Sequence, residues 1–322
     1  MFKTSNLNFI SDKEIESIVS FKDAITVTEN AFHDYFLGKN TMPKKVYLDL
    51  PQFSGDFRAM PAYNDFYQIA GVKWVNSHSL NAKFNLPTVR AMMIVNDPKT
   101  ATPLAILEAS EITNLRTGAS GALSIKYLTK DIPLNIVCVG AGKQAFYQIM
   151  CANEVRSINS LIIIDNNHDV AEQLKIKLET YLPKSVSIQI KTSLEKHLKK
   201  ADVIITTTPS KSPIIFSDYI SSGVLINAIG ADAPGKQELD HELIKKALIV
   251  VDDMDQALHS GEVNTAVTSN QISRSEIYST LGEIIHKKTF NNFDQTKVFD
   301  STGLSIQDLA LAGFIMKKKN IN

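Results

Sequence analysis

The sequence predicts an α/β fold in which a doubly wound parallel sheet is joined to a second, α+β domain. Short apolar runs recur from residue 134 onward, and polar segments of helical length separate most of them. A glycine-rich turn follows the first run, whereas strands follow one another without helices between residues 45 and 109. Apolar runs at such spacing are typical of a parallel sheet that helices cover on both faces.

Composition limits the class of protein further. The chain has 322 residues, enough for two domains, and Lys plus Arg and Asp plus Glu each number 34, so nucleic-acid and membrane partners are not expected. The longest apolar runs fall short of the roughly 18 residues of a membrane helix, and residues 1–11 lack the apolar core of an export signal. Cys138 and Cys151 lack the spacing of a metal site, so we expect no metal and a cytoplasmic location.

The first part of the chain is expected to combine helices with an antiparallel sheet. Residues 11–38 read as helical, with a capping box at Ser11 and Glu14 and an end at Gly38. A turn over residues 96–100 joins the last two strands into a hairpin, and Ser110 caps a helix that continues to residue 128. The expected strands are KVYLDL, DFRAMPAY, AGVKWVNS, TVRAMMIV and TPLAILEA.

The second part is expected to alternate strands and helices over about 120 residues. Its tail from Lys297 reads as a strand and then an amphipathic helix that returns to the first domain. We expect one domain over 1–118, completed by 302–322, and a second over 119–301. The expected strands are 134–139, 160–165, 186–190, 202–206, 224–230 and 247–252.

The turn after the first of these strands has the G-x-G-x-x-A pattern of a Rossmann-type dinucleotide-binding domain. Gly140 permits the tight turn, Gly142 lets the backbone approach a pyrophosphate, and Ala145 lets the helix pack closely on the sheet. Amide groups at the helix start would then face the phosphates, with Ala141 and Gln144 in the same turn. A purely structural turn remains the alternative, because a lone glycine pattern is weak.

Polar residues at the ends of two further strands favour a cofactor and indicate which one. Asp165 ends the second strand, where a carboxylate accepts hydrogen bonds from ribose hydroxyls and repels a 2′-phosphate, so NAD is favoured over NADP. Asp165 could instead cap the following turn. Thr207, Thr208 and Pro209 follow the fourth strand, and their hydroxyls either contact the cofactor or satisfy a turn.

Three cations lie in apolar parts of the first domain. Arg58 and Lys73 are on predicted strands, and Arg116 is on the helix that begins at Ser110. A carboxylate substrate suits an arginine fork, and a desolvated lysine can transfer protons because burial lowers its pKa. From the residues alone, exposed positions on solvated faces are the commoner explanation for such cations.

Several long motifs, in the same order along the chain, resemble the ornithine cyclodeaminase/mu-crystallin family and look closest to its archaeal-type alanine dehydrogenases. This resemblance implies a functional role for the three cations. The similarity extends from about residue 41 to residue 315. The motifs are GDFRAMPAY, AGVKWVNSH, NLPTVRAMMIVNDPKTATPLAILEASEITNLRTGASGALSIKYL, INAIGADAPGKQELD, VVDDMDQALHSGEVN and FDSTGLSIQD.

The resemblance implies roles for particular residues. It implies that Lys73 is catalytic, that Arg58 and Arg116 hold the substrate carboxylate, and that Asp232 is the acid beside the substrate. Asp232 follows the predicted fifth strand, at the edge where such sheets bind ligands, although it could simply be a turn residue before Pro234. Ser301, in the last motif, is expected among the cofactor contacts. The first domain is implied to bind substrate and form a homodimer, and the second to bind the dinucleotide.

The implied reaction is reversible NAD-dependent oxidative deamination of a small, alanine-like L-amino acid to its 2-oxo acid and ammonia, by hydride transfer from Cα. The resembling segment of cyclodeaminases carries an acid where this chain has Arg58, and a cation there disfavours a substrate with a distal ammonium. Three alternatives stay open. They are an ornithine or lysine cyclodeaminase, a ketimine or imino acid reductase, and a mu-crystallin-like ligand-binding protein.

Overall fold

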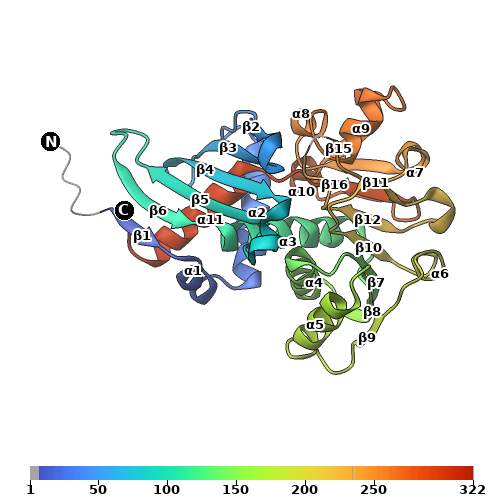
Figure 1. Ribbon diagram of the computed structural model, residues 1–322. Coiled ribbons are helices and arrows are strands. Elements are labelled where there is room, and N and C mark those ends of the chain that lie inside the picture. Colours follow the sequence, from blue (N-terminus) through green and yellow to red (C-terminus); the bar gives the residue numbers. More distant parts are fainter. Residues whose placement is uncertain (1–6, 234, 322) are drawn as a thin grey trace. The chain divides into compact units, whose positions relative to one another are not determined.

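The computed structural model describes residues 7–233 and 235–321, and the chain divides into two compact units (Figure 1). The first unit is Met1–Arg116 together with Leu304–Asn322, and the second is Thr117–Gly303. Residues 1–6, which belong to the segment in which no export signal is expected, lie outside the described part. Among the described helices, none has the length and apolar character needed to cross a membrane.

A six-stranded sheet organises the described part of the first unit, in the order β1-β6-β5-β4-β3-β2. The five strands from β2 to β6 are antiparallel to their neighbours and confirm the five predicted strands. Strand β1, which pairs in parallel with β6, was not predicted because three residues are too few to show alternation. The strands are β1 (Asn8–Ile10), β2 (Val46–Leu50), β3 (Gly55–Asn64), β4 (Ile69–His78), β5 (Val89–Asn96) and β6 (Pro103–Glu108).

The predicted helix over residues 11–38 is in fact two helices, α1 (Asp12–Ile18) and α2 (Phe21–Phe36). The expected capping box of Ser11 and Glu14 is present at the start of α1. A second capping box, formed by Ser20 and Asp23, starts α2, so the chain leaves the helical conformation between them. The helical prediction for this segment is confirmed, whereas the break between the two helices was not predicted because the second start signal was not recognised.

Helix α11 (Ser305–Lys318) returns to the first unit, as predicted for the tail, and packs against α2, β3 and β4 (Figure 1). Gly71 permits a close approach, since a Cβ there would lie 2.9 Å from Leu309 Cδ1. The Ser305 hydroxyl donates to the Pro61 carbonyl at 2.7 Å. The helix is not amphipathic as predicted, because residues 305–313 are buried on every side.

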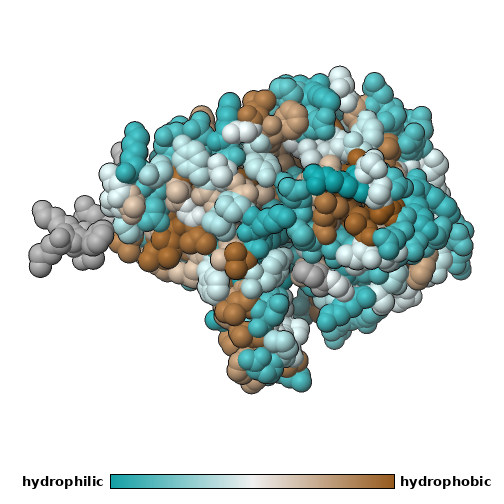
Figure 2. All heavy atoms as spheres, turned by 90° about the horizontal axis from the view of Figure 1, so that it is seen from above, coloured by the Kyte–Doolittle hydropathy of each residue, from teal (hydrophilic) through white to brown (hydrophobic). Residues whose placement is uncertain are grey.

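One face of the first sheet is buried, and the other carries exposed apolar side chains. Lys73, Met60 and Met93 lie opposite one another on the buried face. The other face presents exposed apolar side chains on β2, β4 and β5. We call this set the exposed apolar face; it comprises Val46, Leu48, Trp74, Met92 and Ile94. Figure 2 shows that hydrophobic groups reach the surface of the molecule at several places.

The predicted doubly wound parallel sheet is confirmed in the second unit, where eight described strands are all parallel. Their order is β15-β14-β16-β12-β10-β7-β8-β9. The strands are β7 (Leu134–Val139), β8 (Ile158–Ile164), β9 (Ser187–Ile190), β10 (Val203–Thr206), β12 (Leu225–Ala228), β14 (Leu248–Val251), β15 (Ile277–Thr280) and β16 (Lys297–Asp300). Strand β15 was not predicted, and neither was the separate pair β11 (Lys211–Ile215) and β13 (Gln237–Leu239).

Helix α3 (Ser110–Leu128) begins in the first unit, and its residues from 117 onward belong to the second. The remaining helices of the second unit are α4 (Lys143–Val155), α5 (His168–Glu179), α6 (Glu195–Leu198), α7 (His241–Lys246), α8 (Met254–Ala257), α9 (Glu262–Thr268) and α10 (Leu281–Lys287). Short 3₁₀ turns occur in both units. Those of the first unit are η2 (Pro51–Phe53) and η3 (Ser79–Phe84), and those of the second are η4 (Ser217–Tyr219) and η5 (Arg274–Glu276).

The strand order locates the ligand edge of the second unit. From β7 the chain proceeds to β8 and β9 on one side, then returns to β10 and β12 on the other. Ligands of open α/β sheets bind at the carboxyl ends of the strands where the order reverses, here β7 and β10. Strand β16 lies in parallel beside β12, so Ser301 emerges at the same edge.

Candidate active site

The glycine-rich turn joins β7 to α4 at the ligand edge of the second unit. Gly140 has a φ of +96°, and a Cβ there would lie 2.8 Å from Thr207 Oγ1, so position 140 requires glycine on two grounds. Gln144 and Ala145 lie in the first turn of α4, and Ala145 is fully buried. This turn therefore brings the start of α4 close to the sheet.

Gly142 leaves space beside the first amides of α4. It is the N-cap of the helix and has no side chain to cap it, and a Cβ there would meet nothing within 4 Å. A helix N-terminus attracts anions through its amide groups and its dipole. The space at Gly142 fits the approach of a pyrophosphate.

Asp165 and Thr207, which follow the two strands on either side of β7, hold this turn. Asp165 Oδ2 accepts from the Ala141 amide at 2.7 Å, and Oδ1 accepts from the Asn167 amide at 2.8 Å. Thr207 donates its amide to Val139 at 2.9 Å and its hydroxyl to the Gly140 carbonyl at 3.2 Å. The turn-capping alternative for Asp165 is thus present, and it is compatible with ribose binding because each carboxylate oxygen can accept two hydrogen bonds.

The remaining predicted cofactor residues lie at the same edge. Thr208 and Pro209 follow β10, and the Thr208 amide donates to Glu238 at 2.7 Å. Ser301 follows β16, and its hydroxyl is buried without a hydrogen-bond partner in the described chain. A buried polar atom that protein groups do not satisfy is a position for a ligand atom. The residues present in the second unit fit a bound dinucleotide.

In the first unit, Lys73 and Arg116 meet at a carboxylate that the sequence analysis did not identify. Lys73 Nζ lies 2.7 Å from Asp308 Oδ2, and Arg116 Nε lies 3.1 Å from Asp308 Oδ1. Lys73 also donates to Thr113 Oγ1 at 3.2 Å. Lys73 and Asp308 are fully buried and Arg116 nearly so. We call Lys73, Asp308 and Arg116 the buried charge cluster.

Burial gives Lys73 an unusual proton affinity. Loss of hydration lowers the pKa of Lys73 from its usual 10.5 to about 7. The positive charge of Arg116 lowers this pKa further, whereas the negative charge of Asp308 opposes both effects. A group whose pKa lies near neutrality can both accept and donate a proton during turnover.

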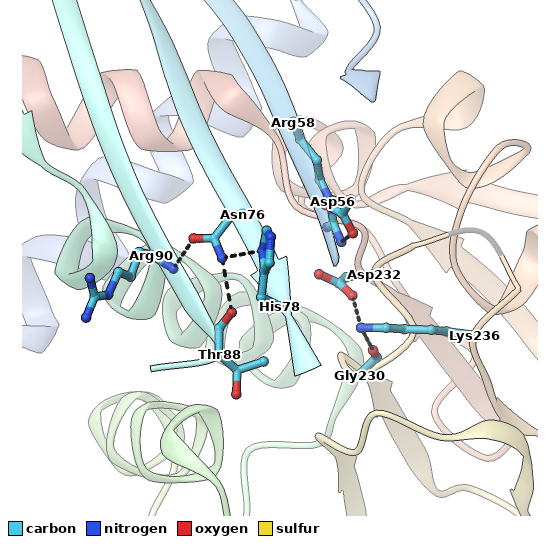
Figure 3. Close-up of polar contacts among 9 residues, drawn as sticks. All are labelled: Asp56, Arg58, Asn76, His78, Thr88, Arg90, Gly230, Asp232 and Lys236. Atoms are coloured by element: carbon cyan, nitrogen blue, oxygen red, sulfur yellow. Dashed lines mark hydrogen bonds and ion pairs between the residues drawn. The ribbon is translucent and has the colours of Figure 1, made fainter. Parts of the chain in front are cut away.

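Arg58 lies on the same face of the sheet as Lys73. It is opposite Val75, which makes it a diagonal neighbour of Lys73 across β3 and β4. Its guanidinium forms a two-point pair with Asp56, with Nε 2.8 Å from Oδ1 and Nη2 3.2 Å from Oδ2 (Figure 3). It also lies over the Tyr47 ring at 5.4 Å. Arg58 therefore already has an anionic partner.

Asp232 lies in the loop after β12, in the second unit. Its side chain is 39% exposed and its Oδ1 pairs with Lys236 Nζ at 2.5 Å. Lys236 also reaches the Gly230 carbonyl at 3.5 Å, so Lys236 connects Asp232 to the end of the strand (Figure 3). Pro234, on which the turn interpretation of Asp232 depended, lies outside the described residues.

Asp308 is the functional candidate that the sequence analysis missed, although the FDSTGLSIQD motif ends on it. A signal was available. Asp308 stands within the apolar stretch LSIQDLALAGFIM, and an acid in a buried helix needs a cationic partner. The pattern could not indicate which cation, because Arg116 is 192 positions away in the sequence.

A doubly wound sheet with this glycine-rich turn, in a chain that also buries a lysine of near-neutral pKa, defines the class of dinucleotide-dependent oxidoreductases. The sequence profile of the ornithine cyclodeaminase/mu-crystallin family matches residues 6–320. The chain belongs to this family, as its motifs predicted.

Individual relatives cover almost the whole chain. An alanine dehydrogenase of Archaeoglobus fulgidus is 42% identical over 306 residues, which are 94% of this chain and 92% of the relative. A solved archaeal alanine dehydrogenase dimer with bound NAD is 40% identical, with a TM-score of 0.90 over 98% of both chains. The Δ1-pyrroline-2-carboxylate reductase of Thermococcus litoralis, solved with NADH and L-proline, is 29% identical, with a TM-score of 0.93 over 98% of both chains.

Two substitutions in the glycine-rich turn are expected to separate its folding role from its ligand role. Gly140→Ala should lower stability by about 2 kcal/mol or more because it forces a strained φ and a clash with Thr207. Gly142→Ala should cost less than about 1 kcal/mol, since alanine is merely a poorer N-cap. Gly142→Ala should nevertheless weaken NADH binding at least about tenfold, because its Cβ fills the space for the pyrophosphate.

Thermal unfolding and NADH fluorescence titration of both variants measure these effects. A folded Gly142→Ala protein that binds NADH as tightly as the unaltered chain would contradict a phosphate site at this turn.

Proposed function

We propose that the chain catalyses the reversible, NAD-dependent oxidative deamination of a small L-amino acid such as alanine, giving a 2-oxo acid and ammonia. The observation that carries this proposal is the buried charge cluster, in which a lysine of near-neutral pKa lies beside an arginine. The 42% identical alanine dehydrogenase supports the choice of a small neutral substrate. Asp56 neutralises Arg58, so repulsion of a distal ammonium by Arg58 is weaker than the sequence alone suggested.

The two arginines are proposed to bind the substrate carboxylate. Arg116 is buried and always charged, and a guanidinium offers a fork of donors that matches a carboxylate. Arg58 shares a sheet face with Lys73, so a carboxylate held there would have its Cα substituents near the lysine. Arg58 then either exchanges Asp56 for the substrate or binds both carboxylates.

Proton transfer is proposed for Lys73 and Asp232. Bound NAD would supply the hydride acceptor for the hydrogen on Cα. Neutral Lys73 would accept the proton that the substrate ammonium must lose before its amine can form the imine. When water adds to the imine carbon, Lys73 and Asp232 would take a proton from the water and deliver one to the departing ammonia. Alanine, NAD and water thus give pyruvate, ammonium and NADH, with one proton released.

The cofactor is proposed to be NAD rather than NADP. Asp165 directly follows β8 at the ligand edge, and its carboxylate would repel a 2′-phosphate. The two solved relatives above, which hold NAD and NADH, support this assignment.

Imine reduction is the second candidate function. The solved pyrroline-2-carboxylate reductase favours it, since that protein is as similar in fold as the alanine dehydrogenase. A cyclic imine carboxylate could use the same arginines and receive a proton from Lys73. The reaction would then run toward the cyclic amino acid.

A substrate panel distinguishes these functions. Supplied with NAD and L-alanine, the enzyme is expected to form NADH and pyruvate in equal amounts, and NADP should support a lower kcat/KM. The panel should include L-ornithine, L-lysine and L-proline, with nicotinamide absorbance and product mass measured together.

Each other outcome has a defined meaning. A cyclic product from ornithine without net NADH indicates a cyclodeaminase, and NADH consumption with a cyclic imine but no alanine activity indicates the reductase. A lack of turnover with every substrate of the panel favours a ligand-binding protein and would contradict the proposal.

The cellular compartment is proposed to be the cytoplasm. Cys138 and Cys151 are both free thiols, and burial raises the pKa of each, so neither is poised to form a disulfide. A reducing compartment suits such a chain.

We also propose that the protein is a homodimer that pairs through the exposed apolar face. Val46, Leu48 and Trp74 are each at least 42% exposed, and contiguous apolar surface of this kind marks an interface. The archaeal alanine dehydrogenase structure, which is a dimer, supports a second copy as the occupant.

Light scattering should give twice the chain mass at micromolar concentration, and Leu48→Asp should give the monomer mass because it buries a charge in the interface. Ile176→Asp is the control, since Ile176 is 61% exposed on α5 of the second unit. A monomeric unaltered protein would contradict the proposal, as would a dimeric Leu48→Asp variant.

A further inference from the structure

The buried charge cluster holds more positive than negative charge. Asp308 is one carboxylate, and it contacts two cations, Lys73 through Oδ2 and Arg116 through Oδ1. All three side chains are at most 8% exposed, so water contributes little to balancing their charge. Buried charges are tolerated when they are paired, and here one carboxylate contacts two cations.

Three charged groups have the largest effects on the pKa of Lys73, and Asp308 is the anion among them. Arg116 faces it from α3 and Lys45 from the segment before β2, and both disfavour its protonated form. Thr113, also on α3, contributes an uncharged oxygen. Asp308, on α11, is the group that favours the protonated form.

Asp308 helps to fix the positions of both cationic groups. Lys73 is a flexible side chain, and two contacts locate its Nζ: the ion pair with Asp308 Oδ2 at 2.7 Å and the hydrogen bond that it donates to Thr113 Oγ1 at 3.2 Å. Arg116 uses Nε for Oδ1, which turns the plane of its guanidinium in a defined way. Asp308 itself is held because α11 is anchored through Ser305 to Pro61.

We propose that Asp308 is a positioning residue that orients Lys73 and Arg116 toward the substrate and supplies the negative charge beside the Lys73 ammonium group. This inference rests on the proposed amino acid dehydrogenase activity for its kinetic consequences. Its consequence for Lys73 itself concerns the folded protein and does not require that activity.

The kinetic test uses Asp308→Asn, which keeps the size of the side chain and removes its charge. Oxidative deamination should speed up as pH rises through the pKa of Lys73, because neutral Lys73 is the proton acceptor. In Asp308→Asn the inflection should move to lower pH by roughly one unit or more, since an opposite charge has been lost. The maximal kcat should fall at least about 100-fold, while NADH affinity stays unchanged.

Asp308→Glu distinguishes the effect of the negative charge from the effect of its position. It keeps the carboxylate but lengthens the side chain by one methylene. Its inflection should stay near that of the unaltered enzyme while kcat falls. Asp12→Asn is the control for stability and charge: Asp12 accepts from the Glu111 amide at the start of α3, also in the first unit. Asp12→Asn should lower the melting temperature without moving the inflection.

The activity-independent test is the pH dependence of unfolding. Lys73 has a lower pKa in the folded chain, about 7, than in the unfolded chain, about 10.5, so the unfolded chain binds more protons between these values. The stability of the unaltered protein relative to Lys73→Met should therefore be constant below about pH 7 and rise above it. In Asp308→Asn, compared with the double variant Lys73→Met/Asp308→Asn, the rise should begin at lower pH.

The outcomes separate the two proposals. An unchanged inflection and kcat within threefold in Asp308→Asn, together with an unchanged onset of the stability rise, would overturn the role of Asp308. Inactivity of the unaltered protein with every amino acid would overturn the proposed function and leave the stability test to decide on Asp308. If Asp308→Asn fails to fold, Asp308→Glu decides on the positioning role, and a kcat of Asp308→Glu within threefold of the unaltered enzyme would overturn that role.

Discussion

The need to balance buried charge in the first unit constrains most of the architecture around it. Lys73 and Arg116 come from a strand and a helix, and the carboxylate between them comes from a helix near the end of the chain. The chain completes the second unit before α11 returns to the first. Gly71 lets α11 pack closely because it has no side chain, and Ser305 fixes the start of α11 by donating a hydrogen bond.

The second unit also contains a buried carboxylate, and its hydrogen-bond partners are uncharged donors. Buried Glu238 accepts hydrogen bonds from the Thr206 hydroxyl at 2.7 Å, the Thr208 amide at 2.7 Å and the Gly230 amide at 2.9 Å. It thereby ties the loop after β10 to the loop after β12, although burial raises its pKa. Loops at the ligand edge are thus held by interior hydrogen bonds, which suits a preorganised cofactor site.

Local pattern revealed the strands and the glycine-rich turn because these features occupy a few consecutive residues. The confirmed expectations, such as β3, β4 and β7, have long apolar or alternating runs. The unpredicted strands β1 and β13 have three residues each, and their existence depends on distant partners. Asp308 was missed for the same physical reason, since its pairing with Lys73 and Arg116 exists only after α11 has packed.

The central claim is that Lys73 performs proton transfer and does not merely fill the core of the first unit. The most direct measurement is turnover per folded molecule of Lys73→Ala, together with its melting temperature and NADH affinity. We predict a loss of 10² to 10⁴-fold in rate, intact NADH binding and no rescue by Lys73→Arg, because a guanidinium keeps its proton at working pH. A folded Lys73→Ala protein with turnover close to that of the unaltered enzyme would contradict this claim.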